Sequence, residues 1–414
     1  MSGQRLRLLF ALGFTPRVDA PHGGRATAAV IRELAREHDV AVIYLRDARL
    51  PLADDSFADA CVVVEAVEPA SGTTTTRKPL IRVRLAAALA RGVPIMVAHA
   101  HLPAFGSRLR ALAGRFDPDV IHFEPAEIAQ YLGSVRQPRA RCVVVVHEPG
   151  AAGAAERWQS VPPLKRSARW LDVFAWRRFE RALGARADLV VTLTARDEDA
   201  MRRVAGRVAR VPLAIPIRNA PLNPIGIEPP TALFVGGYTH PPNEDAALRL
   251  LRSIWPRVRE ALPEARLELV GDSPTAAMLK AIGEGAVARG RVADLEPLLN
   301  AAAAVVLPIR LGGGMRVKSI EALAAGKAVV ASGRAVEGLD VVDGRELLVA
   351  ETDAQFVEET VRVLEDVELR RRLAGAARDW AEMHVSVEAV ASAYTRLYTS
   401  LVDGSPDDEA EPAS

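Results

Sequence analysis

The sequence predicts an α/β protein made of two doubly wound domains, each built on a parallel sheet. Short apolar segments alternate with helical patterns along most of the chain, as expected for strands that are covered on both faces. The alternation stops once, in the segment 211–230 with its six prolines, and then begins again. With 414 residues the chain is also too long for one ordinary domain.

The N-terminal half begins with a strand–helix–strand unit. Strands are expected over residues 6–12 and 40–45, and residues 25–36 between them have small and apolar side chains at helical spacing. The loop 13–24 ends in the pair Gly23 and Gly24. Further strands are expected over residues 61–64, 95–98, 120–123, 142–146 and 189–193.

The C-terminal half repeats the same alternation. Strands are expected over residues 232–235, 267–270, 303–307 and 328–332, and helices over 245–261, 274–282, 315–325, 354–364, 369–384 and 387–401. We therefore predict an N-terminal domain over residues 1–215, a linker over 216–230 and a second domain over 231–384. A last helix over 385–402 and a disordered acidic tail over 403–414 complete the prediction.

Composition excludes several classes of protein. Charged residues make up 25% and hydrophobic residues 49%, which is typical of globular proteins. The 53 basic residues nearly balance the 52 acidic ones, so no nucleic-acid partner is expected. Cys61 and Cys142 lie in apolar segments and are predicted to be buried thiols, which excludes a disulfide scaffold. Because no apolar run could span a membrane and no signal-peptide cleavage region follows Met1, we expect a cytoplasmic protein.

The most informative segment is LPIRLGGGMRVKSIEALAAGKAVV, residues 307–330, in which three glycines separate a strand from a helix. Glycines let backbone approach a ligand closely, and a helix N-terminus favours an anion such as phosphate. Arg316 and Lys318 add positive charge to that first turn, where cations are unfavourable unless an anion lies nearby. Lys318 and Glu321 share a helix face, so Glu321 is placed to bind hydroxyl groups of the same ligand. A tight turn with a surface Lys–Glu pair is the alternative interpretation.

This segment resembles the donor-site signature of retaining GT-B glycosyltransferases of family 4. Residues 233–245 (LFVGGYTHPPNED), 267–272 (LELVGD) and 290–294 (GRVAD) resemble further motifs of that family, in the same order. The resemblance covers most of the C-terminal half and, more loosely, the N-terminal half. It implies two Rossmann-like domains that face each other across a cleft, with the acceptor bound by the first domain and the nucleotide by the second. It also implies that the last helix crosses back to the first domain.

The resemblance assigns roles to residues of the second domain. Glu321 corresponds to the glutamate that binds the ribose, and the backbone near Arg291 and Val292 would contact the base. The remaining donor-binding residues implied by the motifs are Gly236, Gly237, Asn243, Gly312, Gly313, Gly314 and Met315.

Two departures from the family pattern affect the expected chemistry. A first glutamate that contacts the donor sugar would fall at Gly313, so this chain lacks it and resembles a branch with Gly-Gly-Gly-x-Arg-x-Lys before the helix. An arginine and a lysine that neutralise the diphosphate in many relatives fall at Gly237 and Asn243. We expect Arg316 and Lys318 to take over that role, as catalytic residues that stabilise charge on the departing phosphate.

The first domain contributes a smaller set of candidates. His147 follows the strand 142–146 and is a catalytic candidate, since a similarly placed histidine in related enzymes contacts the donor sugar or supports the reaction. A histidine that is satisfied at a strand end is the alternative. Glu124 and the pair Gly23 and Gly24 are expected on the acceptor side, whereas His122 lies inside a strand and is predicted to be a core residue.

A basic region is the other distinctive feature of the first half. Residues 69–116 contain no Asp or Glu. Basic residues lie there and in a second segment that also contains Trp170, Phe174 and Trp176; they are Arg77, Lys78, Arg82, Arg84, Arg91, Arg108, Arg110, Arg115, Arg166, Arg169, Arg177, Arg178 and Arg181. One hypothesis is peripheral contact with an anionic membrane or a phosphorylated acceptor, and a solvated arginine-rich face is the alternative.

The resemblance predicts an enzyme that moves a sugar from a nucleoside-diphosphate sugar to a hydroxyl group with retention of configuration. The acceptor is expected to be a glycan, a lipid-linked molecule or a small molecule, with a role in bacterial cell-envelope polysaccharide or glycolipid synthesis at the inner face of the membrane. The histidines show no metal-ligand spacing beyond His99 and His101, so neither a protein-bound metal nor a cofactor is expected. A GT-B nucleotide-sugar epimerase and a non-enzymatic scaffold that binds nucleotide sugar are the alternatives.

Overall fold

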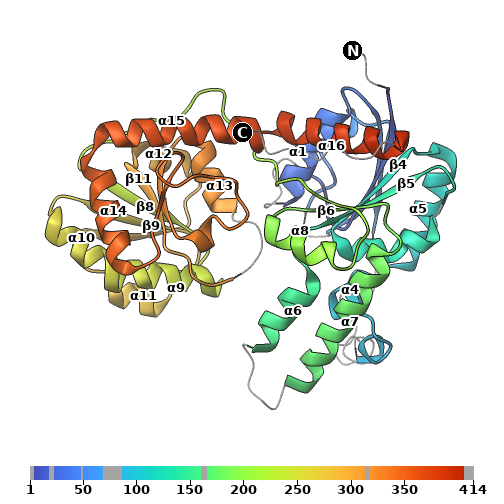
Figure 1. The fold of residues 1–414 in the computed structure, drawn as a ribbon, viewed down its shortest axis with the longest axis horizontal. Helices are drawn as coiled ribbons and strands as arrows, with labels where there is room; N and C mark the ends of the chain where they lie inside the picture. Colours follow the sequence, from blue (N-terminus) through green and yellow to red (C-terminus); the bar gives the residue numbers. More distant parts are fainter. Residues whose placement is uncertain are drawn as a thin grey trace. The chain divides into compact units, whose positions relative to one another are not determined.

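The chain folds into two compact units in the computed structural model, which describes residues 4–17, 23–47, 50–68, 86–135, 137–159, 166–312 and 317–404 (Figure 1). Unit 1 comprises Met1–Ala214 together with Val390–Ser414, and unit 2 comprises Ile215–Ala389. The chain therefore enters unit 2 once and returns to unit 1 within its last helix.

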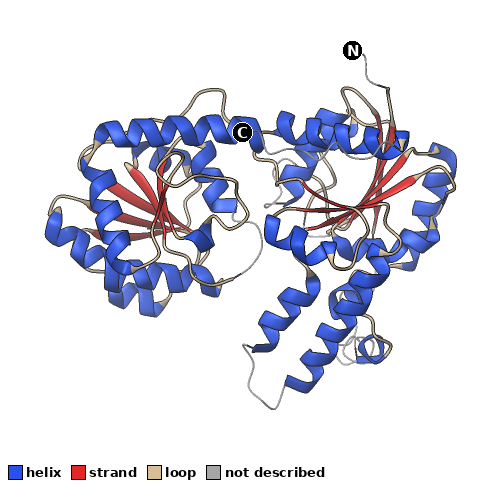
Figure 2. Cartoon of the chain, in the orientation of Figure 1, coloured by secondary structure: helices blue, strands red, loops and turns tan. Residues whose placement is uncertain are grey.

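Unit 1 is built on seven parallel strands in the order β3-β2-β1-β4-β5-β6-β7. Figure 2 shows these strands between layers of helices, so both faces of the sheet are covered. In central strands such as RLLFAL and RCVVVV, every residue after the exposed first arginine is apolar and buried, as expected for strands covered on both faces. The strands are β1 Arg7–Leu12, β2 Asp39–Leu45, β3 Val63–Val67, β4 Val120–Glu124, β5 Arg141–Val146, β6 Leu189–Thr192 and β7 Val208–Arg210.

The helices of unit 1 pack their apolar faces on this sheet. Two of them, α6 and α7, lie side by side and extend away from the sheet as a helical pair (Figure 1). The helices are α1 Gly23–Leu34, α2 Asp55–Ala58, α4 Ile95–His99, α5 Pro103–Phe116, the 3₁₀ helix η1 Ala126–Ser134, α6 Gly150–Gln159, α7 Arg166–Gly184, α8 Ala195–Arg202 and α16 Val387–Asp403, which belongs to unit 1 from Val390 on.

Unit 2 repeats the architecture with six parallel strands in the order β10-β9-β8-β11-β12-β13. The strands are β8 Thr231–Val235, β9 Arg266–Val270, β10 Ala286–Gly290, β11 Ala304–Leu307, β12 Ala328–Ala331 and β13 Leu348–Val349. The helices are α9 Pro241–Arg249, the π-helical turn η3 Leu250–Ile254, α10 Trp255–Ala261, α11 Ala276–Ala281, α12 Glu296–Ala301, α13 Val317–Ala324, the 3₁₀ turn η4 Gly333–Ala335, α14 Asp353–Glu365 and α15 Val367–His384. The predicted fold of two doubly wound parallel-sheet domains is confirmed.

Each sheet has a point where the strand order reverses, between β1 and β4 in unit 1 and between β8 and β11 in unit 2. Loops that leave the two neighbouring strands at such a point diverge to opposite faces of the sheet, and ligands of doubly wound folds bind in the crevice that results. In unit 1 these loops begin at Gly13 and Pro125, and in unit 2 at Gly236 and Pro308. A ligand site is therefore expected at the carboxyl edge of each sheet, beside these loops.

Several local predictions were wrong. The segment 95–98 is the helix α4 rather than a strand, because four apolar residues fit either structure and Pro94 begins a helical turn there. Gly23 and Gly24 form the first turn of α1 rather than the end of a loop. The expected helix 245–261 is interrupted by the π-helical turn η3. Three strands were missed: β7 and β10 because each contains an arginine among few apolar residues, and β13 because it has only two residues.

The last helix, α16, completes the core of unit 1. Its side chains Tyr394 and Tyr398 are buried in unit 1 and stack on each other with ring centroids 5.6 Å apart. Thr395 Oγ1 lies 3.1 Å from His38 Nε2, and Arg207 Nη2 donates to Ser400 Oγ at 3.0 Å. These two contacts fix the helix to the turn between α1 and β2 and to the residue before β7.

Candidate active-site residues in the two units

Unit 1 joins two of the predicted site residues directly. Glu124 is the last residue of β4, and His147 follows β5, the neighbouring strand. The parallel register of these strands brings both side chains to the carboxyl edge of the sheet. His147 Nε2 lies 2.6 Å from Glu124 Oε1, a short and charge-assisted hydrogen bond.

Three further side chains hold Glu124 in place. Thr27 Oγ1, in the first turns of α1, donates to Glu124 Oε1 at 3.0 Å. His122 Nε2 lies 3.5 Å from Glu124 Oε2, and His122 Nδ1 is 2.7 Å from the Tyr398 hydroxyl. Burial raises the pKa of Tyr398 well above its usual value, so the hydroxyl keeps its proton and forms a neutral hydrogen bond with His122.

Charge reinforces this arrangement. Burial alone would raise the pKa of Glu124, but the bonds from His122 and His147 outweigh burial and lower that pKa to about 2. Burial would lower the pKa of His147, whereas the hydrogen bond and charge of Glu124, with a smaller effect of Glu127, raise it above the ordinary value. The ionised carboxylate of Glu124 therefore favours the protonated form of His147 and holds Nε2 of the ring towards itself.

A small pocket adjoins this cluster inside unit 1. Glu124, His122 and Thr27 supply its polar wall, and Tyr394 of α16 lies beside them. The remaining lining residues are apolar: Phe10, Ala26, Val30, Ile31, Leu193, Pro212, Leu213, Ala214 and Val390. A charged carboxylate in such an apolar setting must be fully hydrogen-bonded to remain ionised. Glu124 is thus a buried partner of His147, not an exposed group of an open surface.

In unit 2, two glycines let the backbone loops after β8 and β9 touch. Gly271 has a φ of +148°, and a Cβ added there would lie 2.0 Å from the Gly236 oxygen. A Cβ added at Gly236 would lie 2.9 Å from Asn243 Cγ and 3.1 Å from Lys318 Nζ. Only glycine fits these two positions without moving the residues around them.

The same edge positions Lys318. Its Nζ donates to Asn243 Oδ1 and lies 5.2 Å from the centre of the Phe234 ring, in a cation–π contact. Asn243 Nδ2 in turn donates to the Gly237 carbonyl at 2.8 Å. Four residues predicted from two separate motifs therefore form one cluster at the carboxyl edge of the sheet: Gly236, Gly237, Asn243 and Lys318.

We expect Gly271→Ala to destabilise unit 2 by about 2 kcal/mol, because it adds both backbone strain and a clash with Gly236. The melting temperature of this unit should fall by several degrees in a thermal unfolding scan. Gly283→Ala is the matched control, since a Cβ added at Gly283 would have no atom within 4 Å. Equal melting temperatures for the two variants would contradict the close approach described here.

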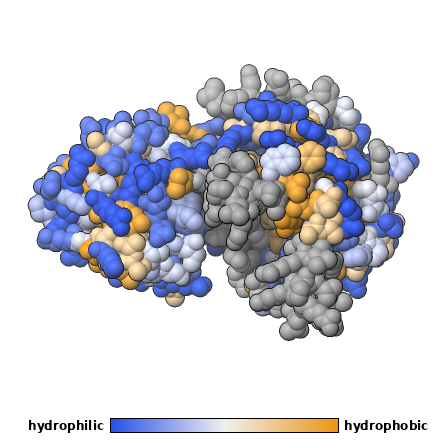
Figure 3. Space-filling model, turned by 90° about the horizontal axis from the view of Figure 1, so that it is seen from below, coloured by the Kyte–Doolittle hydropathy of each residue, from blue (hydrophilic) through white to orange (hydrophobic). Residues whose placement is uncertain are grey.

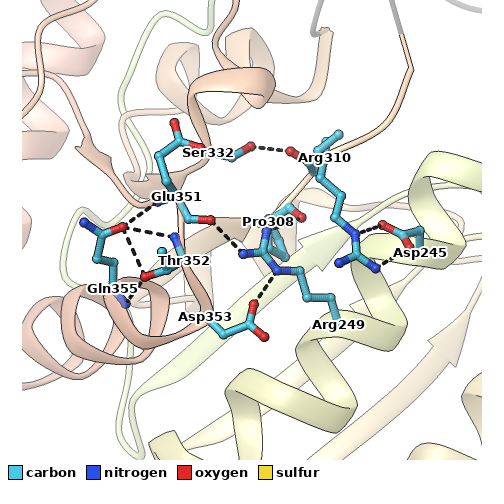
Figure 4. A network of polar contacts seen from close by, with 10 residues as sticks. Asp245, Arg249, Pro308, Arg310, Ser332, Glu351, Thr352, Asp353 and Gln355 are labelled. Atoms are coloured by element: carbon cyan, nitrogen blue, oxygen red, sulfur yellow. Dashed lines mark hydrogen bonds and ion pairs between the residues drawn. The ribbon is translucent and has the colours of Figure 1, made fainter.

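A buried arginine ties together the loops beside this cluster (Figure 4). Arg249 Nε donates to Asp353 Oδ1 at 2.6 Å, Nη2 to the Glu351 carbonyl at 2.9 Å and Nη1 to the Pro308 carbonyl at 3.2 Å. Arg310 makes a bidentate pair with Asp245, with both bonds 2.8 Å long. The first residues after β11 are thereby anchored to α9 and α14, immediately before the glycine loop.

The structure describes some of the other predicted donor residues and not others. Gly313, Gly314, Met315 and Arg316 lie outside the described residues. Gly312 has a φ of +90°, which glycine adopts readily. Glu321 lies one turn after Lys318 on α13 and is partly buried. Arg291 is exposed, with Nε 3.9 Å from Asp272 Oδ1, and Val292 packs against the core of unit 2.

Sequence reasoning missed several partners of the site. Thr27 and Tyr398 were not predicted, and no local signal could have found them, since each meets its partner only through the fold. His122 was predicted to be a core residue and is buried, but its contact with Glu124 was not foreseen. The buried Arg249 had one available signal, because an arginine within an apolar helical segment needs a buried acceptor.

Two properties of the described ranges bear on the chemistry. Within them, no group of three His, Cys, Asp or Glu side chains is placed to hold a metal ion. No helix in the described part of the chain combines the length and apolarity needed to span a bilayer.

Solved structures with the same architecture cover nearly the entire chain. Sucrose-phosphate synthase from Thermosynechococcus elongatus covers 97% of this chain and 100% of its own, with 18% identity and a TM-score of 0.64. HepE from Anabaena, in complex with UDP and glucose, covers 96% and 100% with 13% identity and a TM-score of 0.60. WaaG, a glycosyltransferase involved in lipopolysaccharide biosynthesis, covers 95% and 99% with 16% identity and a TM-score of 0.59. The fold is therefore the GT-B fold.

Both units also match sequence models of glycosyltransferases. Residues 229–366 match the model described as Glycosyl transferases group 1, and residues 23–218 match the model described as Glycosyltransferase Family 4. The comparison with curated proteins gives no match. The chain is a glycosyltransferase of the group 1, GT-B type.

Proposed function

We propose that this glycosyltransferase moves a sugar from a nucleoside-diphosphate sugar to a hydroxyl group and retains the configuration of the anomeric carbon. The observation that supports this best is the Lys318 cluster, in which an ammonium group lies beside close-packed glycines at the carboxyl edge of unit 2. Such an edge suits a diphosphate, because backbone N–H groups and a cation can approach it together. The similar fold of HepE, solved with UDP-glucose, is consistent with a uridine nucleotide.

In this proposal unit 2 holds the donor. Lys318 and Arg316 neutralise the diphosphate, with the N–H groups of Gly312, Gly313 and Gly314. Glu321 accepts hydrogen bonds from the ribose, and the backbone near Arg291 and Val292 contacts the base. Gly236 and Gly237 leave room for the donor's phosphates beside Asn243.

In this scheme the chemical step uses no carboxylate nucleophile of the enzyme. The acceptor oxygen bonds to the anomeric carbon on the face from which the diphosphate leaves, and the bond from that carbon to the phosphate oxygen breaks. The diphosphate takes the electron pair of this bond, and its oxygen receives the acceptor proton. Lys318 and Arg316 stabilise the charge that develops on the departing group, a term that is often the largest in catalysis. His147 donates its Nδ1–H to the transferred sugar and so positions or polarises it.

For the acceptor we propose a glycan, a lipid-linked molecule or another hydroxyl compound of cell-envelope synthesis, reached from the cytoplasmic side. The likeness to WaaG, which is involved in lipopolysaccharide biosynthesis, supports this choice over a purely soluble pathway. We further propose that the reaction needs no protein-bound metal, since Arg316 and Lys318 supply the positive charge that a metal would bring.

A thermal-shift screen against UDP, GDP, ADP, dTDP and their common sugars tests the donor site. A ligand that binds only the folded protein raises its melting temperature, by an amount that grows with concentration over Kd. We expect one nucleotide to do so, UDP first, and Glu321→Ala to abolish the shift. The anomeric coupling constant of the product then reports retention or inversion directly.

A nucleotide-sugar-binding scaffold is the second candidate, favoured by Gly313 at the position where a donor-contacting glutamate is expected. It predicts a thermal shift with nucleotide sugar but no product and no nucleoside diphosphate release with any acceptor. The absence of any shift across the panel would contradict both candidates.

A further inference from the structure

The helix α7 presents two different faces to its surroundings. Its inward face packs Val173 and Trp176 against Val97 of α4 and Ala154 of α6. Trp176 lies so close to α6 that a Cβ added at Gly150 would be 2.2 Å from its ring. The outward face takes no part in this packing, apart from Arg178, whose Nη1 donates to the Arg91 carbonyl at 3.4 Å.

That outward face combines exposed apolar side chains with arginines. Trp170 is 56% exposed, Phe174 53% and Leu171 45%, and the rings of Trp170 and Phe174 stack with centroids 6.3 Å apart. One to three turns further along the helix, Arg177, Arg178 and Arg181 are exposed. Residues 170, 174, 177, 178 and 181 recur at helical spacing, so they share one side of α7.

Acidic groups are kept away from this face. The helix has only two acidic residues, Asp172 and Glu180, and both are buried. Asp172 Oδ1 accepts the backbone N–H of Ile95 at the start of α4, at 2.9 Å. Glu180 Oε1 accepts the backbone N–H of Ala151 at the start of α6, at 3.0 Å. Both acidic side chains of the helix are thus buried, and of the two Glu180 still interacts electrostatically with Arg177.

We propose that this face, which we call the α7 face and define as Trp170, Leu171, Phe174, Arg177, Arg178 and Arg181, docks on an anionic lipid bilayer. An interfacial helix binds such a surface by burying aromatic and aliphatic side chains at the headgroup level while arginines contact the phosphates. The chain as a whole has a formal net charge of only +1, so attraction to anionic lipid requires a local basic surface of this kind. The inference does not depend on the proposed sugar transfer.

The shape of unit 1 suits this contact. The α6–α7 pair extends from the body of the unit, so its outward side can meet a flat surface without the sheet intervening (Figure 1). Figure 3, which views the molecule from the end to which this pair extends, shows apolar residues gathered on unit 1. A helix that projects in this way can lie against a planar bilayer along its outward side.

Cosedimentation of the full-length protein with vesicles tests the proposal. Vesicles of phosphatidylcholine are compared with vesicles in which a third of the lipid is phosphatidylglycerol, in low and in physiological salt. We expect binding to the anionic vesicles only, weakened by salt because charges at a surface are screened. The triple variant Arg177→Gln, Arg178→Gln, Arg181→Gln should lower the partition coefficient by about a hundredfold.

Matched variants separate a specific face from general charge or stickiness. Arg252→Gln, Arg257→Gln, Arg266→Gln removes three exposed arginines from unit 2 and should leave binding unchanged. Trp170→Ser, Phe174→Ser should lower binding about tenfold or more, whereas Val342→Ser, Met383→Ser, which removes exposed apolar groups of unit 2, should not. Quenching of tryptophan fluorescence by brominated lipid should fall in Trp170→Phe.

Three results would overturn the proposal: no binding to anionic vesicles in low salt, equal loss of binding in the unit 2 control, or unchanged binding when both aromatic residues of the α7 face are replaced. All substituted side chains are exposed, so a melting curve for each variant verifies that it still folds. Since vesicle binding needs no donor or acceptor, its failure would leave the proposed sugar transfer untouched, and the reverse also holds.

Discussion

Replacing Lys318 by alanine is expected to lower kcat/KM for sugar transfer by about a hundredfold or more, which is the usual cost of removing one group that stabilises charge in a transition state. The ammonium group is held by Asn243 and lies over Phe234, so its position is set before any ligand binds. A preorganised cation stabilises the departing diphosphate without first having to be ordered. The measurement is kcat/KM for sugar transfer from donor to acceptor, determined for the wild-type protein and for each variant.

Two comparisons make this expectation specific. Lys280→Ala removes an exposed lysine of the same unit and should leave turnover unchanged. Asn243→Ala keeps the charge of Lys318 but removes the group that orients it, and its effect should be smaller than that of Lys318→Ala. If Lys318→Ala turned over at the wild-type rate, the proposed role of this residue in the departure of the diphosphate would be wrong.

Replacing Glu124 by glutamine is expected to lower turnover about 10- to 100-fold, the range found when the carboxylate partner of a functional histidine is removed. Glutamine preserves the size of the side chain and an acceptor oxygen for Thr27, so the change acts mainly on charge. Without the carboxylate, burial dominates and the pKa of His147 falls. Activity that depends on a protonated His147 should then be lost at lower pH than in the wild-type protein.

The same pair predicts how stability depends on pH. The pKa of Glu124 is lowered from 4.5 to about 2, so its contribution is present above pH 4.5 and is lost as the pH falls towards 2. The pKa of His147 is raised above 6.5, so its contribution is complete below that value and is lost as the pH rises through the folded-state pKa. Wild-type protein should therefore exceed Glu124→Gln in stability most clearly between pH 4.5 and the raised pKa of His147.

Glu127→Gln is the matched control, because Glu127 affects His147 only through its charge and makes the smallest of the named contributions. Titration of the His147 ring by NMR should show a large fall of the pKa in Glu124→Gln and a small one in Glu127→Gln. This titration does not require a substrate. An unchanged His147 pKa in Glu124→Gln would show that the carboxylate does not set the charge of the ring.

The sequence predicted secondary structure best where burial alone determines which residue types are allowed. Strands buried on both faces must be apolar, so segments such as residues 142–146 were recognised from their composition alone. The same criterion gave the wrong prediction for residues 95–98. Four apolar residues before a helix of fourteen residues can pack equally well as a helical turn. What decides between the two is whether a neighbouring strand is available, which is a property of the whole fold.

The site divides along similar lines. Lys318, Gly236 and Asn243 were predicted because each belongs to a motif in which residue type and spacing are both constrained. His147 was predicted from its place at a strand end and Glu124 from the family resemblance of its segment. Their hydrogen bond was not predicted, because it depends on the order of strands in the sheet. The Tyr398 hydroxyl meets His122 across 276 residues of sequence, and no pattern within either segment announces that contact.

The division of the chain between the two units sets an order for its biosynthesis. Unit 2 is one continuous stretch, so everything it needs has been made once Ala389 has left the ribosome. Unit 1 cannot complete its core so early, although its first 214 residues are translated first. Tyr394 and Tyr398, which are buried in it, follow unit 2 in the sequence. Until α16 emerges, His122 lacks the Tyr398 hydroxyl, and the pocket beside Glu124 lacks Tyr394. The nascent N-terminal segment therefore exposes an unfinished core throughout the synthesis of unit 2, and apolar surface exposed in this way is prone to aggregate.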